Sequence, residues 1–273
     1  MPYVTTSDNT HLFVKDWGSG RPVVLLHGWP LSADSWDDQA MALADAGYRA
    51  IAYDRRGFGR STQPWSGYDY DTLADDLAVV IDKTGATGAT IVGFSMGGGE
   101  VARYMSRHGG KSVVKAALIS SVVPYMLKAA DNPQGTPQKT FDEIGKALQD
   151  DRAKFFGSFF PDFFGVGVMS HPVSDELLQW ARSVSMQASL KATLACAKAF
   201  ATTDFRPDLA AFRVPTLIVH GTGDKIVPID AAGRAAERGI KQSRLLEYEG
   251  APHGLFATEK TRLTNDLLAF LED

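Results

Sequence analysis

The chain of 273 residues is long enough to bury a substantial core, as one large domain or as a domain with an insertion. Its 28 Lys and Arg residues against 32 Asp and Glu residues give a net charge of −4, which excludes the basic surface typical of nucleic-acid-binding proteins. No apolar run is long enough to cross a bilayer, residues 1–8 show no signal peptide, and the single cysteine, Cys196, fits a reducing compartment. We therefore expect a cytoplasmic protein with no nucleic-acid or membrane partner. Whether it is a monomer or a homo-oligomer stays open.

Strands and helices alternate along the first 120 residues. The predicted elements are a strand hairpin at 3–6 and 12–17, strands at 22–26, 48–53, 89–92 and 115–120, helices at 35–46 and 71–83, and a helix after residue 95. Continuously apolar runs such as 22–26 are typical of strands buried on both faces. Alternation at this spacing predicts an α/β protein with a doubly wound, mostly parallel sheet.

The alternation stops between residues 122 and 212, where the pattern is mostly helical and rich in aromatic residues. We interpret this stretch as a helical cap inserted between two core strands, so that the chain divides into core 1–121, cap 122–212 and core 213–273. The core resumes with predicted strands at 214–220 and 244–248 and predicted helices at 229–238 and 255–271. The predicted sheet then has eight strands.

Six phenylalanines fall within residues 155–164 of the predicted cap. Any one of them could attach the cap to the core, but together they would also make an apolar lining for a substrate pocket. We take Phe155, Phe159 and Phe160 as candidate substrate-binding residues. Cys196 lies among small and apolar residues and is expected to be a packed thiol, not a nucleophile.

A Gly-x-Ser-x-Gly motif centred on Ser95 joins the predicted strand at 89–92 to the helix after it. A turn this sharp strains the serine backbone, so that the positions two residues away, Gly93 and Gly97, must lack bulk. An ordinary glycine-rich loop is the alternative interpretation. In a nucleophile elbow the turn exposes the serine hydroxyl at the top of the sheet, and the main-chain N–H of Met96 faces the position of a developing oxyanion.

A second glycine-bearing loop, residues 27–30, follows the strand at 22–26. Glycine lets the main chain approach a substrate, and the N–H of Trp29 is the candidate for a second oxyanion donor. Pro30 restricts its own backbone and that of the residue before it. We expect it either to direct the Trp29 carbonyl toward the substrate or only to stiffen the loop.

Asp224 and His253 each follow directly after a predicted strand, as Ser95 does. Active sites of open parallel sheets gather beyond the carboxyl ends of the strands, so these three side chains are expected to meet there. Their order along the chain, Ser then Asp then His, is that of α/β-hydrolase triads. An isolated Asp224 could also be a turn-capping carboxylate.

Other residues compete for these roles. His27 and His220 also end strands, but both precede the candidate acid in the chain and could be buried rings that hold their loops. Among the acids, Asp54 precedes Ser95, whereas Asp204 and Asp230 do not directly follow a strand.

Longer blocks around these positions resemble one family closely. They lie at residues 27–30, 53–61, 93–100, 203–209, 214–217 and 251–254. The sequence is similar, nearly end to end, to the cofactor-free, non-haem haloperoxidases of the α/β-hydrolase superfamily, which are also described as arylesterases and perhydrolases. The resemblance implies Ser95 as nucleophile, His253 as base, Asp224 as its orienting acid, and Trp29 and Met96 as oxyanion donors.

The expected function is that of a serine esterase acting on small carboxylic (aryl) esters, with hydrogen peroxide as an alternative to water. Neither a cofactor nor a metal is expected, because the sequence has no Cys-x-x-Cys-His, His-Glu-x-x-His or Walker motif. Lactonases and carbon–carbon bond hydrolases use the same triad and stay open as alternatives. Epoxide hydrolases and haloalkane dehalogenases carry an aspartate at the elbow, so Ser95 argues against both. A hydrolase-fold receptor or binding protein usually lacks a triad member, and here none is missing.

Overall fold

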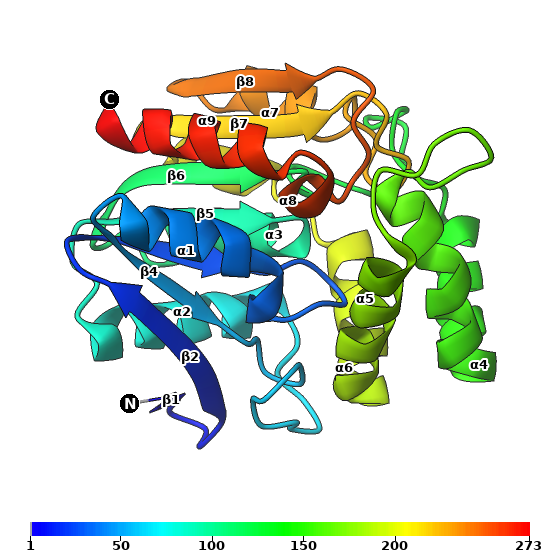
Figure 1. Cartoon of the computed structure of the whole chain (residues 1–273), viewed down its shortest axis with the longest axis horizontal. Coiled ribbons are helices and arrows are strands. Elements are labelled where there is room, and N and C mark those ends of the chain that lie inside the picture. Colours follow the sequence, from blue (N-terminus) through cyan, green and yellow to red (C-terminus); the bar gives the residue numbers. More distant parts are fainter. Residues whose placement is uncertain (1) are drawn as a thin grey trace.

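An eight-stranded sheet runs through the centre of the computed structural model, which describes residues 2–273 (Figure 1). Its strands are β1 (Tyr3–Thr5), β2 (His11–Gly18), β3 (Arg21–Leu26), β4 (Tyr48–Tyr53), β5 (Ala89–Phe94), β6 (Val113–Ile119), β7 (Thr216–Gly221) and β8 (Ser243–Tyr248). They lie in the order β1-β2-β4-β3-β5-β6-β7-β8. The β1–β2 and β2–β4 pairs are antiparallel and the other five pairs are parallel, which confirms the predicted doubly wound, mostly parallel sheet.

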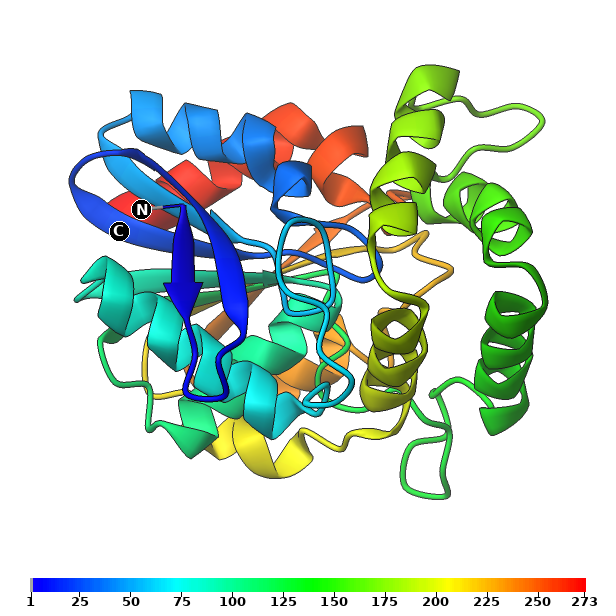
Figure 2. The same cartoon turned by 90° about the horizontal axis from the view of Figure 1, so that it is seen from below.

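Helices cover both faces of the sheet (Figure 2). Those outside the predicted cap are α1 (Asp37–Asp45), α2 (Tyr70–Thr84), α3 (Met96–Arg107), α7 (Gly233–Gly239), α8 (Leu255–Thr258) and α9 (Lys260–Glu272), with a 3₁₀ turn, η1 (Ala33–Trp36), before α1. Helices α1 and α9 contact each other on one face, while α2 and α3 lie together on the other. The central strands are therefore shielded from solvent on both sides, as their continuous apolar sequences require.

Helix α2 shows how local sequence fixes these elements. The Asp69 carboxylate accepts a 3.0 Å hydrogen bond from the main-chain N–H of Thr72 and caps the helix start. Gly85 ends the helix in the left-handed conformation, with φ of 66°. The apolar stripe expected from the sequence, including Leu73 and Leu77, is buried against the sheet.

Between β6 and β7 the chain forms α4 (Gln138–Phe164), α5 (Asp175–Gln187), α6 (Leu190–Thr202) and the 3₁₀ helix η2 (Arg206–Ala211). Helices α4, α5 and α6 stand beyond the carboxyl ends of the parallel strands (Figure 1). Helix α4 is kinked at Asp151, whose φ of −159° and ψ of 91° are not helical. The division at residues 122 and 212 into core and cap stays our proposal.

Two predicted helices have different limits in the structure. The helix expected at 229–238 begins only at Gly233, because the φ of −119° and ψ of −93° at Ala232 are not helical. The helix expected at 255–271 is divided into α8 and α9 at Glu259, whose φ of −120° takes it out of the helical region. Hydrophobic periodicity runs through both interruptions and does not detect them. Among residues 2–273, no helix has the length and apolar character needed to span a membrane.

Candidate active site

Ser95 is the single residue between β5 and α3, and its backbone is strained, with φ of 52° and ψ of −117°. The turn requires its glycines. A Cβ on Gly93 would lie 2.4 Å from the Gly97 carbonyl oxygen, and one on Gly97 would lie 2.6 Å from the Leu26 carbonyl oxygen. The Ser95 N–H bonds to the Ile119 carbonyl at 2.8 Å, which ties the elbow to the neighbouring strand β6. The strained turn thus holds Ser95 at the carboxyl end of the sheet.

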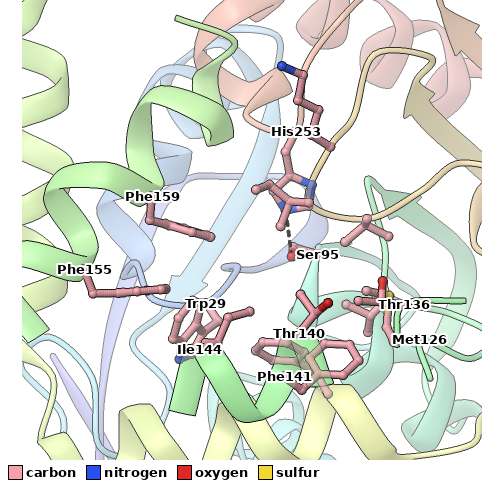
Figure 3. Close-up of a pocket in the computed structure, with 15 residues that line it drawn as sticks. Trp29, Ser95, Met126, Thr136, Thr140, Phe141, Ile144, Phe155, Phe159 and His253 are labelled. Atoms are coloured by element: carbon pink, nitrogen blue, oxygen red, sulfur yellow. Dashed lines mark hydrogen bonds between the residues drawn. The ribbon is translucent and has the colours of Figure 1, made fainter. Parts of the chain in front are cut away.

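Ser95, His253 and Asp224 form one chain of hydrogen bonds. The Nε2 atom of His253 lies 2.9 Å from Ser95 Oγ (Figure 3). The Nδ1 atom of His253 lies 2.7 Å from Asp224 Oδ2. Ser95 follows β5, Asp224 follows β7 and His253 follows β8, as the sequence predicts. All three are buried, although Ser95 and His253 still line a cavity. The structure therefore brings together the three residues predicted as nucleophile, base and acid.

Four donors surround the Asp224 carboxylate. Its Oδ1 accepts the main-chain N–H groups of Ile226 and Val227 at 2.9 and 2.8 Å, and its Oδ2 faces His253 Nδ1 and, at 3.3 Å, His220 Nε2. Burial alone would raise the pKa of Asp224, but the charge of His253 and the hydrogen bonds from both histidines outweigh it and hold the pKa well below its usual range. The ionised carboxylate keeps the proton of His253 on Nδ1 and leaves Nε2 to accept one from Ser95.

The competing histidines have other partners. In His27, Nε2 accepts the main-chain N–H of Arg55 at 3.0 Å, so Nδ1 carries the proton and donates to the Gly28 carbonyl at 2.9 Å. Burial and the charge of Arg55 lower the pKa of His27 well below its usual value, which keeps the ring neutral. In His220, Nε2 lies 2.9 Å from the Val227 carbonyl oxygen and therefore donates to it. Both rings hold loops in place, and neither bonds to Ser95.

The competing acids are bound elsewhere. Asp54 accepts the N–H of Ala33 at 2.9 Å and both the N–H and the Nε of Arg60 at 2.8 Å. Asp204 and Asp230 each pair with a nearby arginine.

Burial raises the pKa of the Cys196 thiol to about 12, which agrees with a packed and unreactive side chain.

A cavity of about 200 Å³ opens above Ser95 (Figure 3). Its walls are mostly apolar and come from both the core and the helices between β6 and β7; they comprise Trp29, Ser95, Val122, Met126, Thr136, Thr140, Phe141, Ile144, Phe155, Phe159, Phe200, Lys225, Ile226, Val227 and His253. A pocket that is apolar apart from a few polar groups at one point is suited to a small, largely uncharged ligand.

Phe155 and Phe159 line this cavity, but Phe160 does not. Positions four residues apart share one face of a helix, whereas Phe160 turns away and packs against Phe156 and Phe163 with ring centroids 6.0 and 5.6 Å apart. Phe160 has no exposed surface and attaches the helix to its surroundings. Pro30 is likewise buried and lies outside the lining residues.

The two candidate oxyanion donors lie on separate segments. Met96 is the first residue of α3, and the first N–H groups of a helix have no partner within it. Trp29 lines the cavity, and its indole Nε1 donates to the Thr193 carbonyl at 3.0 Å, which holds the side chain against α6. Its ring also packs on Phe159 at 5.6 Å. The oxyanion role of both main-chain N–H groups stays a proposal.

Several lining residues were missed by the sequence analysis. Val227 could have been found from the sequence, since it follows the candidate acid, Asp224, by three positions. No sequence pattern identifies four other lining residues, because each lies far from Ser95 in sequence and reaches the cavity only through the packing of α4 and α6. These are Thr140, Phe141, Ile144 and Phe200.

Several known proteins resemble this chain in both fold and sequence. The sequence profile of the family described as alpha/beta hydrolase fold matches residues 21–260. The non-haem chloroperoxidase of Streptomyces lividans is 46% identical over 100% of both chains, and the bifunctional esterase/perhydrolase of Acinetobacter calcoaceticus is 42% identical over 99% of both. The crystal structure of bromoperoxidase from Bacillus anthracis has a TM-score of 0.96 at 42% identity and covers 99% of each chain. This chain therefore belongs to the α/β-hydrolase family and, within it, to the group of non-haem haloperoxidases.

Proposed function

We propose that the protein is a serine esterase that cleaves small carboxylic esters through an acyl-Ser95 intermediate, and that it forms peracids when hydrogen peroxide takes the place of water. The observation that carries the proposal is the continuous chain of hydrogen bonds from Ser95 through His253 to Asp224 at the floor of an apolar cavity. A serine hydroxyl is a weak nucleophile at neutral pH and needs such a base to become reactive.

In the first half of the reaction, Ser95 Oγ attacks the ester carbonyl carbon while its proton passes to His253 Nε2. The ionised Asp224 stabilises the imidazolium that forms. The main-chain N–H groups of Trp29 and Met96 are proposed to stabilise the tetrahedral oxyanion, each donor contributing on the order of 10²–10³ in rate. His253 then returns the proton to the leaving alcohol, and the acyl group stays on Ser95.

In the second half, His253 takes a proton from water, the hydroxide attacks the acyl carbon, and the carboxylic acid leaves as Ser95 regains its proton. Hydrogen peroxide can react in the same position. His253 takes a proton from hydrogen peroxide, and the deprotonated oxygen attacks the acyl carbon. The bond between that carbon and Ser95 Oγ breaks as His253 returns the proton to Ser95, and the product is a peracid that oxidises bromide in free solution. The Acinetobacter calcoaceticus relative, named a bifunctional esterase/perhydrolase, supports the inclusion of this second activity.

The cavity supports a preference for short acyl groups with an aromatic alcohol portion. Its volume of about 200 Å³ is small, and the facing rings of Phe155 and Phe159, 5.5 Å apart, provide an aromatic wall. A series of p-nitrophenyl esters of increasing acyl length measures this preference. Faster turnover of acyl chains longer than about twelve carbons would contradict it.

The experiment that tests the proposed function combines activity with labelling. Wild-type protein should hydrolyse p-nitrophenyl acetate, and a fluorophosphonate should abolish that activity while adding one phosphonyl group to the peptide that contains Ser95. Lactones and carbon–carbon bond substrates assayed on the same preparation separate the alternative hydrolases. No hydrolysis and no labelling would favour a binding protein. The cytoplasmic location and a homo-oligomeric state stay proposals, which cell fractionation and light scattering would test.

A further inference from the structure

Two adjacent arginines directly after β4, Arg55 and Arg56, are buried, and their side chains are each 1% exposed. Each forms an ion pair with a buried carboxylate, Arg55 with Glu100 and Arg56 with Asp76. A buried charge is costly to desolvate, and two such pairs side by side contribute little net stability compared with apolar residues. The triad chemistry uses neither pair, so a separate role needs to be identified.

Arg55 contacts the loop that carries Trp29 at two points. Its Nη2 donates to the His27 carbonyl at 2.6 Å, and its main-chain N–H donates to His27 Nε2 at 3.0 Å. The His27 ring in turn contacts the next residue, because its Nδ1 donates to the Gly28 carbonyl at 2.9 Å. Arg55 therefore holds His27 directly and Gly28 through the His27 ring, and these are the two residues immediately before Trp29.

The same guanidinium contacts the elbow helix. Its Nε donates to Glu100 Oε1 at 2.5 Å, and the Tyr53 hydroxyl donates to Glu100 Oε2 at 2.9 Å. Glu100 lies in α3 one turn after Met96. Arg55 thus joins the helix that carries one candidate oxyanion donor to the loop that carries the other.

Arg56 has no such connection. Its guanidinium donates to Asp76 in α2 at 2.6 and 2.7 Å and to Asp8, before β2, at 2.8 Å. It joins the N-terminal segment to α2, and its hydrogen bonds go neither to the loop at residues 27–30 nor to α3. Both pairs join a buried arginine to a buried carboxylate, although Arg56 also pairs with the exposed Asp8, and they differ in the segments that they connect.

We infer that the Arg55–Glu100 pair is a positioning device for the oxyanion hole, which sets the separation of the Trp29 and Met96 main-chain N–H groups. Two donors on different segments can bind one oxygen only if that separation is fixed, and errors of a fraction of an ångström reduce their effect. The Arg56–Asp76 pair serves only the fold. This inference rests on the proposed esterase function.

The test compares Glu100→Gln with its matched control, Asp76→Asn. Each substitution removes one buried carboxylate charge beside an arginine and keeps the side-chain shape. We measure kcat and KM for p-nitrophenyl acetate, the inhibition constant of phenylboronic acid, which forms a tetrahedral adduct with an active-site serine, and stability by denaturant unfolding. We expect Glu100→Gln to lower kcat about tenfold and to weaken boronate inhibition by a similar factor, with KM nearly unchanged. Asp76→Asn should lose stability but keep both kcat and boronate inhibition.

A double variant separates positioning from stability. Arg55→Met with Glu100→Leu removes both charges together and replaces them with apolar groups, a change that folded proteins often tolerate. We expect it to fold and to keep the low kcat and weak boronate inhibition of Glu100→Gln. A stable double variant with wild-type kcat, or an Asp76→Asn variant that loses kcat and boronate affinity as Glu100→Gln does, would overturn the inference alone. Absence of ester hydrolysis and of serine labelling in the wild-type protein would overturn the proposed function with it.

Discussion

His220 Nε2 lies 3.3 Å from Asp224 Oδ2, the same carboxylate oxygen that His253 Nδ1 contacts at 2.7 Å. Two histidines thus contact the same oxygen of the triad acid, and His220 is also held by the Val227 carbonyl. His220 has no exposed surface and does not line the cavity, so it acts on the reaction through the groups that it contacts, Asp224 and Val227.

We expect His220→Leu to lower kcat for ester hydrolysis by about tenfold, because a less firmly held carboxylate orients His253 less well, and small misplacements cost up to ~10²-fold. The variant should also lose stability, since it removes the buried hydrogen bond from His220 to the Val227 carbonyl. Steady-state kinetics check the prediction, with His108→Leu as control, because His108 pairs with Asp75 far from the cavity. Equal kinetics in both variants would contradict it.

Stability should depend on pH through His27. Burial and the Arg55 charge hold the pKa of its folded-state imidazole well below the ordinary value. At neutral pH the ring is uncharged in both states and has no pH-linked effect. As the pH falls through about 6.5, the unfolded chain gains a proton that the folded chain does not, and stability falls.

The measurement is the free energy of unfolding at neutral pH and at about pH 5, both above the carboxylate range. The loss between the two should be smaller in His27→Gln than in the wild type, whereas His171→Gln, at an exposed position, should behave as the wild type. An unchanged loss in His27→Gln would show that the folded protein protonates His27.

We expect kcat/KM to rise as the pH is raised from about 5 to about 8, because His253 accepts the Ser95 proton only when its imidazole is neutral. Asp224 stays ionised across this range, since its pKa is held below its usual value. A pH–rate profile with p-nitrophenyl acetate checks this. A flat profile, with chemistry shown to limit the rate, would argue against His253 as the base.

Pro30 should influence the choice between peroxide and water. Although it does not line the cavity, it follows Trp29, whose backbone it restricts. If it directs the Trp29 carbonyl toward the acyl carbon, that carbonyl accepts a hydrogen bond from an attacking hydroperoxide. Pro30→Leu should then lower the ratio of peracid formation, measured by bromide-dependent halogenation, to ester hydrolysis. Equal losses in both activities would make Pro30 a structural residue, and the exposed Pro172→Leu serves as control.

The sequence predicted the fold class because strand-length apolar runs alternating with amphipathic helices leave few other arrangements. Ser95, Asp224 and His253 were found because each directly follows a strand, and the carboxyl ends of parallel strands meet at one edge. That argument needs no knowledge of side-chain packing.

Features that depend on packing were not predictable. Phe160 was chosen with Phe155 and Phe159 on composition, but the rotation of α4 turns it out of the cavity. The positioning role proposed for Arg55 could also not be predicted from the sequence, since its partners His27 and Glu100 are far from it in the chain.

The residual kcat of Ser95→Ala tests the central claim most directly, that Ser95 is the nucleophile of an ester hydrolase. The strained backbone at Ser95 is held by Gly93 and Gly97, so the alanine variant should fold as the wild type does, which circular dichroism and unfolding would verify. We predict that kcat for p-nitrophenyl acetate falls by on the order of 10⁴-fold or more. A folded Ser95→Ala protein that keeps more than about a few per cent of wild-type kcat would contradict it.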